Sequence, residues 1–301
     1  MSQKPKGRST QTFVNMMAQT WKRPTLTLVE LGWRWLAGIP LILWALKWAQ
    51  PHLPELEAIW AQLGTMTFFH PAEMAATIGV SSRQLLAIAR PLLPVFIPVA
   101  VLWWVAVGTF GQVLYARRTL GAESRASLGV FFVLRLVRSL GVMLCWTIWL
   151  NILLAVAHRE LHTTATLGAE PDVLVFAALS IVATLALFVG WAGISWPLTL
   201  AMNWNAVHGD SLFASLRSAV TQRAVRAEVM EIALVMCIVK LALLVLALTF
   251  SATPLPFSAV ATPEFLRNWW IGLIILYSFM SDYFHGVRFR YYSVVCRDLA
   301  E

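Results

Sequence analysis

Two charged residues stand inside long apolar runs of this sequence, where a charge is expensive. Lys240 lies in "VMCIVKLALLV" and Asp282 lies in "LYSFMSDYFHGVRFRYYS". A charge inside a bilayer costs roughly 2.5–3.5 kcal/mol on insertion scales, so each of them is expected to have a partner. An ammonium and a carboxylate can form an ion pair that joins two helices, or they can bind and release a proton or ion along a transport path.

The depths of the two residues favour pairing with each other. Asp282 lies about 8 residues, or ~12 Å, from the basic boundary at Arg290, and Lys240 lies about 12 residues, or ~18 Å, into the preceding helix. Helical side chains tilt toward their own N-terminus, so in two antiparallel helices these side chains lean toward one depth. We predict a Lys240–Asp282 ion pair that is chiefly structural, with a proton or ion relay as the alternative.

The segment "HRELH" is a second candidate for chemistry. His158 and His162 are four residues apart, which places both imidazoles on one face of a helix, where they could bind a metal. The metallopeptidase motif has a glutamate directly after the first histidine, whereas Glu160 is two residues along. We therefore expect polar residues at a membrane interface, with a metal site at His158 and His162 as the alternative.

Other cofactors lack their residue patterns. A b-type haem with two histidine ligands needs two histidines facing the membrane interior, and His285 is the one histidine clearly inside an apolar run. The three cysteines are far apart in the sequence, without the spacing of a metal site or a disulfide framework. No glycine-rich phosphate loop is present. We expect no cofactor and no enzymatic activity.

The elements that must hold these residues are transmembrane helices. The 301 residues are 59% hydrophobic and 13% charged, with mean hydropathy +0.70, against about 45–50% and about 25% in soluble domains. The excess is concentrated in runs of about 20 residues, the length that crosses a ~30 Å hydrocarbon core. Glu30 and Arg34 are four residues apart and can pair on one helix face. We predict an all-α bundle of six spans, at residues 28–49, 92–114, 139–157, 173–200, 229–251 and 268–290.

The basic residues predict the orientation. Of the 23 lysines and arginines, most lie in alternate connections, together with the two termini, and few lie in the connections between them. Because basic residues are retained on the cytoplasmic side, we predict a multi-pass protein of the cell's inner (plasma) membrane with both termini in the cytoplasm. The net charge of +8 follows from this orientation, so no nucleic-acid partner is expected. The richer connections are 1–24, 115–138, 204–228 and the C-terminal end; the poorer ones are 50–90, 158–172 and 252–267.

Two segments between spans are short, amphipathic and basic: "RASLGVFFVLRLVRSL" (125–140) and "DSLFASLRSAVTQR" (210–223). Such helices lie in the headgroup plane, with the apolar face toward the lipid and the arginines at the phosphates. The organisation is then a basic cytoplasmic tail, 1–24, followed by a single transmembrane helical domain, 25–298. We predict lipid-headgroup contacts at Arg125, Arg135, Arg138, Arg217 and Arg223.

The exit of the fourth span has a family-like pattern. In "AMNWNAVHGDSLFASLRSAVTQR" a span ends in a polar residue and a glycine, and a small helix of Ala, Leu, Arg and Ser follows. The ending "FRYYSVVCRDLAE" places an aromatic pair shortly before Arg-Asp. These features resemble polytopic bacterial proteins grouped with the membrane domain of glycerophosphodiester phosphodiesterases. The resemblance implies a six-helix fold and no phosphodiesterase activity, because that chemistry belongs to a separate soluble domain. The matching positions are Gly209, Ser211, Ser215, Leu216 and Arg217.

Three functions follow from these features. The first is a non-enzymatic integral membrane protein, an accessory or scaffold component in lipid or envelope physiology, whose partners are membrane lipids and other membrane proteins. The second is a small transporter or permease that uses Lys240 and Asp282. The third is a membrane enzyme with a metal at His158 and His162.

The predicted orientation can be tested with reporter fusions. Alkaline phosphatase is active only outside the cytoplasm. A fusion after Glu301 should be inactive and a fusion within residues 252–267 should be active, because the flanking basic residues hold the C-terminus in the cytoplasm. The reverse pattern would overturn the orientation.

Overall fold

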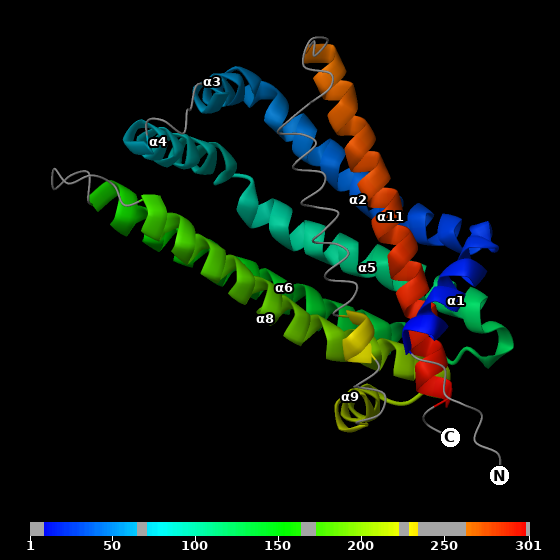
Figure 1. The fold of residues 1–301 in the computed structure, drawn as a ribbon. Coiled ribbons are helices and arrows are strands. Elements are labelled where there is room, and N and C mark those ends of the chain that lie inside the picture. The colour runs from blue at the N-terminus through cyan, green and yellow to red at the C-terminus, as the bar shows by residue number, and fades with distance from the viewer. Residues whose placement is uncertain (1–8, 65–70, 164–172, 223–228, 234–262, 299–301) are drawn as a thin grey trace. The chain divides into compact units, whose positions relative to one another are not determined.

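The regular elements of the described residues are all helical (Figure 1). The computed structural model describes residues 9–64, 71–163, 173–222, 229–233 and 263–298. The predicted all-α class is confirmed for these residues. Short 3-10 turns at Gln50–His52 and Gly121–Glu123 and a π-helical turn at His158–Thr163 extend three of the α-helices. The α-helices are α1 (Ser9–Trp21), α2 (Pro24–Ala49), α3 (Leu53–Gly64), α4 (Pro71–Ala89), α5 (Leu93–Leu120), α6 (Leu128–Ala157), α8 (Val173–His208), α9 (Leu212–Thr221) and α11 (Pro263–Asp298).

Four helical segments of the described chain are long and apolar enough to cross a membrane, and they match the first four predicted spans to within one residue at the start of the second and fourth. The fifth predicted span, 229–251, lies almost entirely outside the described residues. The sixth lies within α11, which is long enough to cross but more polar than the other four, since it carries Asp282 and His285. The four segments are Pro24–Gln62, Leu93–Glu123, Leu128–Glu160 and Leu174–His208.

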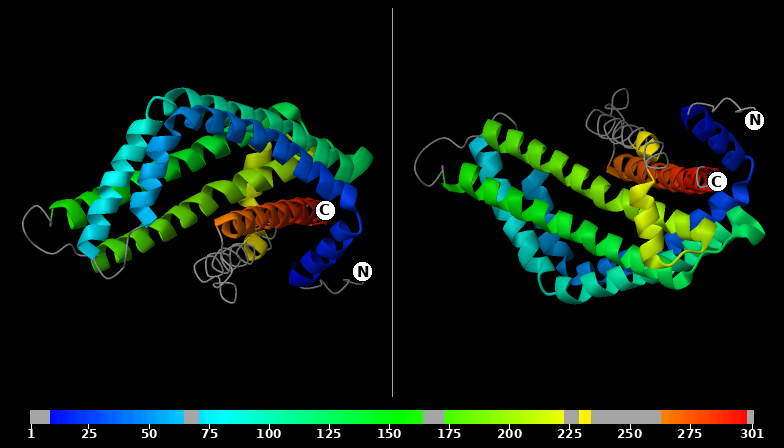
Figure 2. Two further views of the ribbon diagram at one scale, coloured as in Figure 1. Left: turned by 90° about the horizontal axis from the view of Figure 1, so that it is seen from above. Right: turned by 90° about the horizontal axis from the view of Figure 1, so that it is seen from below.

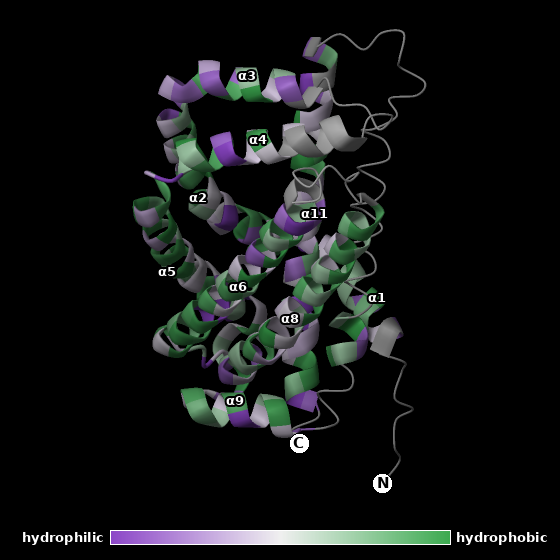
Figure 3. Cartoon of the chain, turned by 90° about the vertical axis from the view of Figure 1, so that its left-hand side faces the viewer, coloured by the Kyte–Doolittle hydropathy of each residue, from purple (hydrophilic) through white to green (hydrophobic). Residues whose placement is uncertain are grey.

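The apolar side chains of these helices are turned outward to an unusual degree. None of the most apolar stretch of Leu128–Glu160 is buried within the protein, and 11% of that in Leu174–His208 is buried. Figure 3 shows hydrophobic residues along much of α6 and α8. Exposed apolar surface of this extent is unfavourable in water, whereas lipid solvates it. The helices are therefore suited to a bilayer, as a multi-pass membrane protein requires.

The first predicted interfacial helix, 125–140, is wrong as a separate element. Residues 128–140 are the N-terminal turns of α6, which continues without a break to Ala157. The reason is local: no proline or capping sequence separates Arg138 from the span that follows, so the helix propagates. Arg135 is buried and Arg138 is half-buried in α6. The basis for predicting their contact with lipid headgroups from a surface helix is therefore lost.

The second predicted interfacial helix is a separate element, α9. Gly209 adopts a φ of +76°, the left-handed conformation that commonly ends a helix and that glycine adopts most readily. Its amide donates to the carbonyl of Asn205 at 2.9 Å. Ser211 then occupies the N-cap position of α9, although its side chain makes no capping hydrogen bond. The turn at Gly209 thus ends α8 and gives α9 its own direction, across the end of α8 in Figure 3.

The chain forms two compact units, residues 1–36, 107–134 and 196–301, and residues 37–106 and 135–195. In the first unit α1 packs along the C-terminal half of α11, as two views in Figure 2 show. The Tyr283 hydroxyl donates to the carbonyl of Met17 at 2.8 Å, and Arg290 Nη1 donates to Thr20 Oγ1 at 2.8 Å. Residues 1–24 were predicted to be a basic tail, and the helix α1 within them was not predicted.

The second unit joins α6 and α8 through small residues. A Cβ atom at Gly141 of α6 would lie 2.9 Å from Ile194 Cγ2, and one at Gly190 of α8 would lie 3.5 Å from Cys145 Sγ. Close backbone approach at small residues is a common way for helices to associate in lipid. The indole of Trp149 also donates to Thr184 Oγ1 at 3.2 Å. Small residues of α6 and α8 thus let the two helices approach closely at Gly141 and Gly190.

Gly209 should be the glycine that α9 depends on. Gly209→Ala should lower stability by about 1–2 kcal/mol, the cost of placing an L-residue in the left-handed region, and its Cβ would lie 3.0 Å from Arg125 Cβ. Gly129→Ala is the control, because a Cβ there meets nothing within 4 Å; it should leave stability unchanged or raise it by up to ~1 kcal/mol. Thermal unfolding in detergent measures both. Equal effects of the two variants would contradict the assignment.

Candidate functional site

Arg34 is the centre of a charged cluster in the first unit. It lies one turn after Glu30 on α2, and its Nε donates to Glu30 Oε1 at 2.8 Å. The indole Nε1 of Trp33 donates to the other carboxylate oxygen, Oε2, at 2.7 Å. Residues three and four positions apart share a helix face, so one turn of α2 supplies a carboxylate together with two donors. The predicted Glu30–Arg34 pair is confirmed.

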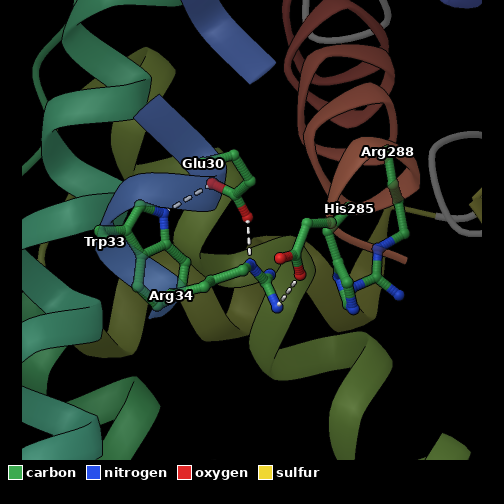
Figure 4. Close-up of polar contacts among 6 residues, drawn as sticks. Glu30, Trp33, Arg34, His285 and Arg288 are labelled. Atoms are coloured by element: carbon green, nitrogen blue, oxygen red, sulfur yellow. Dashed lines mark hydrogen bonds and ion pairs between the residues drawn. The ribbon is translucent and has the colours of Figure 1, made fainter. Parts of the chain in front are cut away.

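Asp282 of α11 contacts the same guanidinium. Arg34 Nη1 lies 3.4 Å from Asp282 Oδ1, and this ion pair links α2 to α11 (Figure 4). Glu30 and Asp282 are 4% and 7% exposed. Removing one partner of a buried ion pair typically costs 3–5 kcal/mol, because the remaining charge is left uncompensated. Two buried carboxylates on different helices therefore share Arg34 as a counter-charge.

The partner predicted for Asp282, Lys240, lies outside the described residues, so the Lys240–Asp282 pair stays a prediction. Arg34 is the partner that the sequence analysis missed. The signal was available, because Arg34 lies about 10 residues, or ~15 Å, from the start of α2, a depth similar to the ~12 Å inferred for Asp282. The spacing of Glu30 and Arg34 predicts only the pair within α2, whereas one guanidinium can bind two carboxylates.

His285 and Arg288 border the cluster on α11. Arg288 Nη2 lies 2.8 Å from His285 Nδ1, and both side chains line a cavity with Glu30 and Arg34. The cavity has a volume of about 20 Å³, which is enough for about one water molecule. Its remaining lining is supplied by α5, α8 and α11, through Gln112, Tyr115, Thr199 and Phe289.

Two lining groups have unused hydrogen-bonding capacity among the described residues. The Tyr115 hydroxyl and Gln112 Oε1 are buried and make no hydrogen bond within that part of the chain. Tyr115 is 1% exposed, and the hydroxyl of Thr119 lies near it without the geometry of a hydrogen bond. Buried polar atoms without a partner are rare in folded proteins and call for a ligand, an ion or a water molecule.

A second polar cluster fixes the exit of α8. Asn205 Nδ2 donates to the carbonyl of Asp210 at 2.6 Å, and Asn205 Oδ1 accepts from the amide of Ser127 at 3.0 Å. The Trp204 indole donates to Asp210 Oδ2 at 2.9 Å. One buried asparagine therefore ties the α5–α6 connection to the turn before α9. These residues lie beside the glycine turn on which the family resemblance was based.

The arginines predicted at headgroups differ in position. Arg125 is exposed beside this turn, with its Nη1 3.5 Å from the carbonyl of His208. Arg217 is exposed on α9. Arg223 lies outside the described residues, while Arg135 and Arg138 belong to α6. Arg125 and Arg217 are thus both accessible in the first unit.

The predicted metal site cannot be assembled from the described residues. His158 opens the π-helical turn after α6, but the side chain of His162 is outside the described part. Within that part, no three His, Cys, Asp or Glu side chains come together as a metal site would require.

At the far end of α11, burial raises the pKa of the Cys296 thiol and so keeps it protonated and unreactive.

Comparison with family models, with curated proteins and with solved structures gives no match. The resemblance to the phosphodiesterase-associated membrane domain therefore stays a prediction. Function has to be argued from the residues of this chain.

Double-mutant cycles can identify the partner of Asp282. Arg34→Met should destabilise the protein by about 3–5 kcal/mol, and combining it with Asp282→Asn should cost less than the sum of the single changes, with a coupling of about 0.5–3 kcal/mol. Lys240→Met with Asp282→Asn forms a second cycle that tests the predicted pair. Stability is measured by unfolding in detergent.

Arg267→Met is the matched control, because Arg267 is an exposed arginine on the same helix as Asp282. It should show no coupling to Asp282→Asn. If the losses in the Arg34 cycle add within about 0.5 kcal/mol, Arg34 and Asp282 do not interact.

Proposed function

We propose that the protein is a non-enzymatic, multi-pass protein of the cell's inner (plasma) membrane, with both termini in the cytoplasm. In this proposal it is an accessory or scaffold component in lipid or envelope physiology. Its partners are membrane lipids and other membrane proteins. The four apolar helices support the membrane location, and the uneven distribution of basic residues supports the orientation.

The observation that carries the proposal is the two-faced character of α9. Ser215 and Ala219 are buried on its inner face. On the opposite face Phe213 is 81% exposed and Val220 is 45% exposed, and Arg217 between them is exposed too. These three residues are spaced i, i+4 and i+7, which places them on one side of a helix. Apolar side chains beside an arginine match the boundary between acyl chains and phosphates.

Other exposed arginines of the first unit add positive charge. Arg117 and Arg118 are exposed at the end of α5, and Arg125 is exposed in the connection that follows. The nearby acid Glu123 contacts Arg297 at 3.3 Å, and the carboxylate of Asp210 accepts from Trp204. An excess of guanidinium groups at the end of apolar helices favours anionic phospholipids, at roughly 1 kcal/mol for each basic residue near the surface.

The charged cluster supports a structural role in this proposal. Arg34 contacts Glu30 and Asp282 together, and both carboxylates are buried. A group that is already fully engaged in joining two helices is poorly placed to turn over a substrate. The same cluster gives the second candidate function, a small transporter or permease with Lys240 and Asp282 as its charged pair, because Asp282 lies one helical turn before His285, which lines the polar cavity.

Lipid binding by α9 can be measured with a charge-matched pair of variants. Arg217→Gln should weaken binding of anionic phosphatidylglycerol by about fivefold, the equivalent of ~1 kcal/mol, and leave binding of phosphatidylcholine unchanged. Native mass spectrometry of the purified protein with added lipid gives both affinities.

Arg267→Gln removes the same charge from an exposed position near the start of α11 and should leave both affinities unchanged. Phe213→Ser should weaken binding of both lipids, because it removes apolar contact instead of charge. If Arg217→Gln and Arg267→Gln bind phosphatidylglycerol equally well, α9 is not the lipid contact.

A further inference from the structure

The cavity beside Arg34 is the place where four helices of the first unit bring polar side chains together. Glu30 and Arg34 come from α2, Gln112 and Tyr115 from α5, Thr199 from α8, and His285 and Arg288 from α11. Figure 4 shows His285 between Arg288 and Arg34. The site is small and polar, and its volume suits one water molecule.

The hydrogen-bonding groups of the cavity leave room for such a molecule. Gln112 Oε1 can only accept, while the Tyr115 hydroxyl can donate and accept. Neither makes a hydrogen bond to another described residue. Tyr115 cannot turn away freely, because its hydroxyl oxygen lies 2.7 Å from where a Cβ on Gly286 would be. One water could donate to Gln112 and accept from Tyr115, and it would still have a donor and an acceptor site for the other lining groups.

The contact between Arg288 and His285 favours the neutral form of the histidine. A guanidinium has donors only, so His285 Nδ1, 2.8 Å from Arg288 Nη2, has to accept. The imidazole is then neutral and carries its proton on Nε2. If Nδ1 bound a proton, this hydrogen bond would break and two cations would face each other, so Arg288 would have to move away.

The charges around His285 provide a partner for a proton bound there. From α2 the cavity is lined by Glu30 and Arg34, from α5 by Tyr115, and from α8 by the uncharged Thr199. From α11 itself come Arg288 and, one turn before His285, Asp282. Arg290 of the same helix is engaged by Thr20 of α1. Among the described residues at the cavity, two carboxylates and two guanidiniums balance, and His285 is the side chain among them whose ordinary titration range includes physiological pH.

We propose that this cavity is a proton-binding site, in which one water molecule held by Tyr115 and Gln112 delivers a proton from solvent to His285 Nδ1. A bond forms between the proton and Nδ1, the hydrogen bond from Arg288 is released, and the water is re-formed by a proton from the solvent. The imidazolium then competes with Arg34 for the carboxylates of Asp282 and Glu30. Proton binding is thereby coupled to the contact between α2 and α11.

The test is nitrogen NMR of the full chain, labelled with ¹⁵N-histidine and held in lipid nanodiscs. The His285 signals are identified by their loss in His285→Gln. Near neutral pH they should report an unprotonated Nδ1 and a protonated Nε2. On acidification from about pH 8 to about pH 5, the range in which histidine ordinarily titrates, both nitrogens should become protonated. A histidine that is charged at pH 8, or still neutral at pH 5, would overturn the proposal.

The role of the water is tested by removing the hydroxyl that would hold it. Tyr115→Phe should shift the pH of the His285 transition, whereas Tyr277→Phe, a change at a half-exposed tyrosine of the same helix as His285, should not. Gln112→Leu serves as a second variant if Tyr115→Phe does not fold. Equal transitions in the Tyr115 or Gln112 variant and in Tyr277→Phe would exclude a water-linked site. Neither result depends on lipid binding by α9, so this proposal and the proposed function can fail separately.

Discussion

The first unit depends on the sharing of one guanidinium between two buried carboxylates. Glu30 and Asp282 sit on helices that are far apart in the chain, and Arg34 lies 2.8 Å from one and 3.4 Å from the other. A buried charge without a counter-charge is costly. Separating α2 from α11 would therefore break the Arg34–Asp282 ion pair and leave the Asp282 carboxylate without this counter-charge. Close approach also requires small residues: a Cβ at Gly111 would overlap the ring of Trp33, and one at Gly286 would crowd Tyr115. The ion pairs and the two glycines therefore favour the same close packing of α2, α5 and α11.

A second constraint acts at the end of α8, where a single buried asparagine satisfies two stretches of backbone. Asn205 bonds the amide of Ser127 and the carbonyl of Asp210, where two connections meet. Gly209 permits the left-handed turn between them. Since α9 begins directly after this turn, the direction of its apolar face is set by buried hydrogen bonds and not by the lipid alone. A helix oriented in this way can present Phe213 and Arg217 to a membrane without first having to fold on it.

The sequence predicts those features that depend on short range or on hydrophobicity. The Glu30–Arg34 pair follows from a spacing of four, and the first four spans follow from apolar runs. Features that depend on tertiary contact were missed. The contact of Arg34 with Asp282 joins distant helices, and α1 is stabilised by contacts of Phe13 and Thr20 with α11. The prediction of a separate helix at 125–140 was wrong for a local reason. Amphipathic character does not end a helix where no helix-breaking residue follows. The breaker at Gly209 is what made the equivalent prediction succeed for α9.

A structural clamp and a proton site can occupy the same residues, because both follow from one balance of charge. Among the residues that the structure describes at the cavity, two carboxylates and two guanidiniums balance in charge, which favours burying them together. Such a cluster tolerates little change, since protonating a carboxylate would weaken its pair with Arg34 and a guanidinium does not lose its proton. His285 is different: it is neutral in the contact with Arg288, and it lies on the helix that Asp282 ties to α2. A positive charge added at His285 would act directly on the ion pairs of Arg34 with Glu30 and Asp282, which join α2 to α11. Because these ion pairs are buried and strong, a single proton there would change the contact between the two helices.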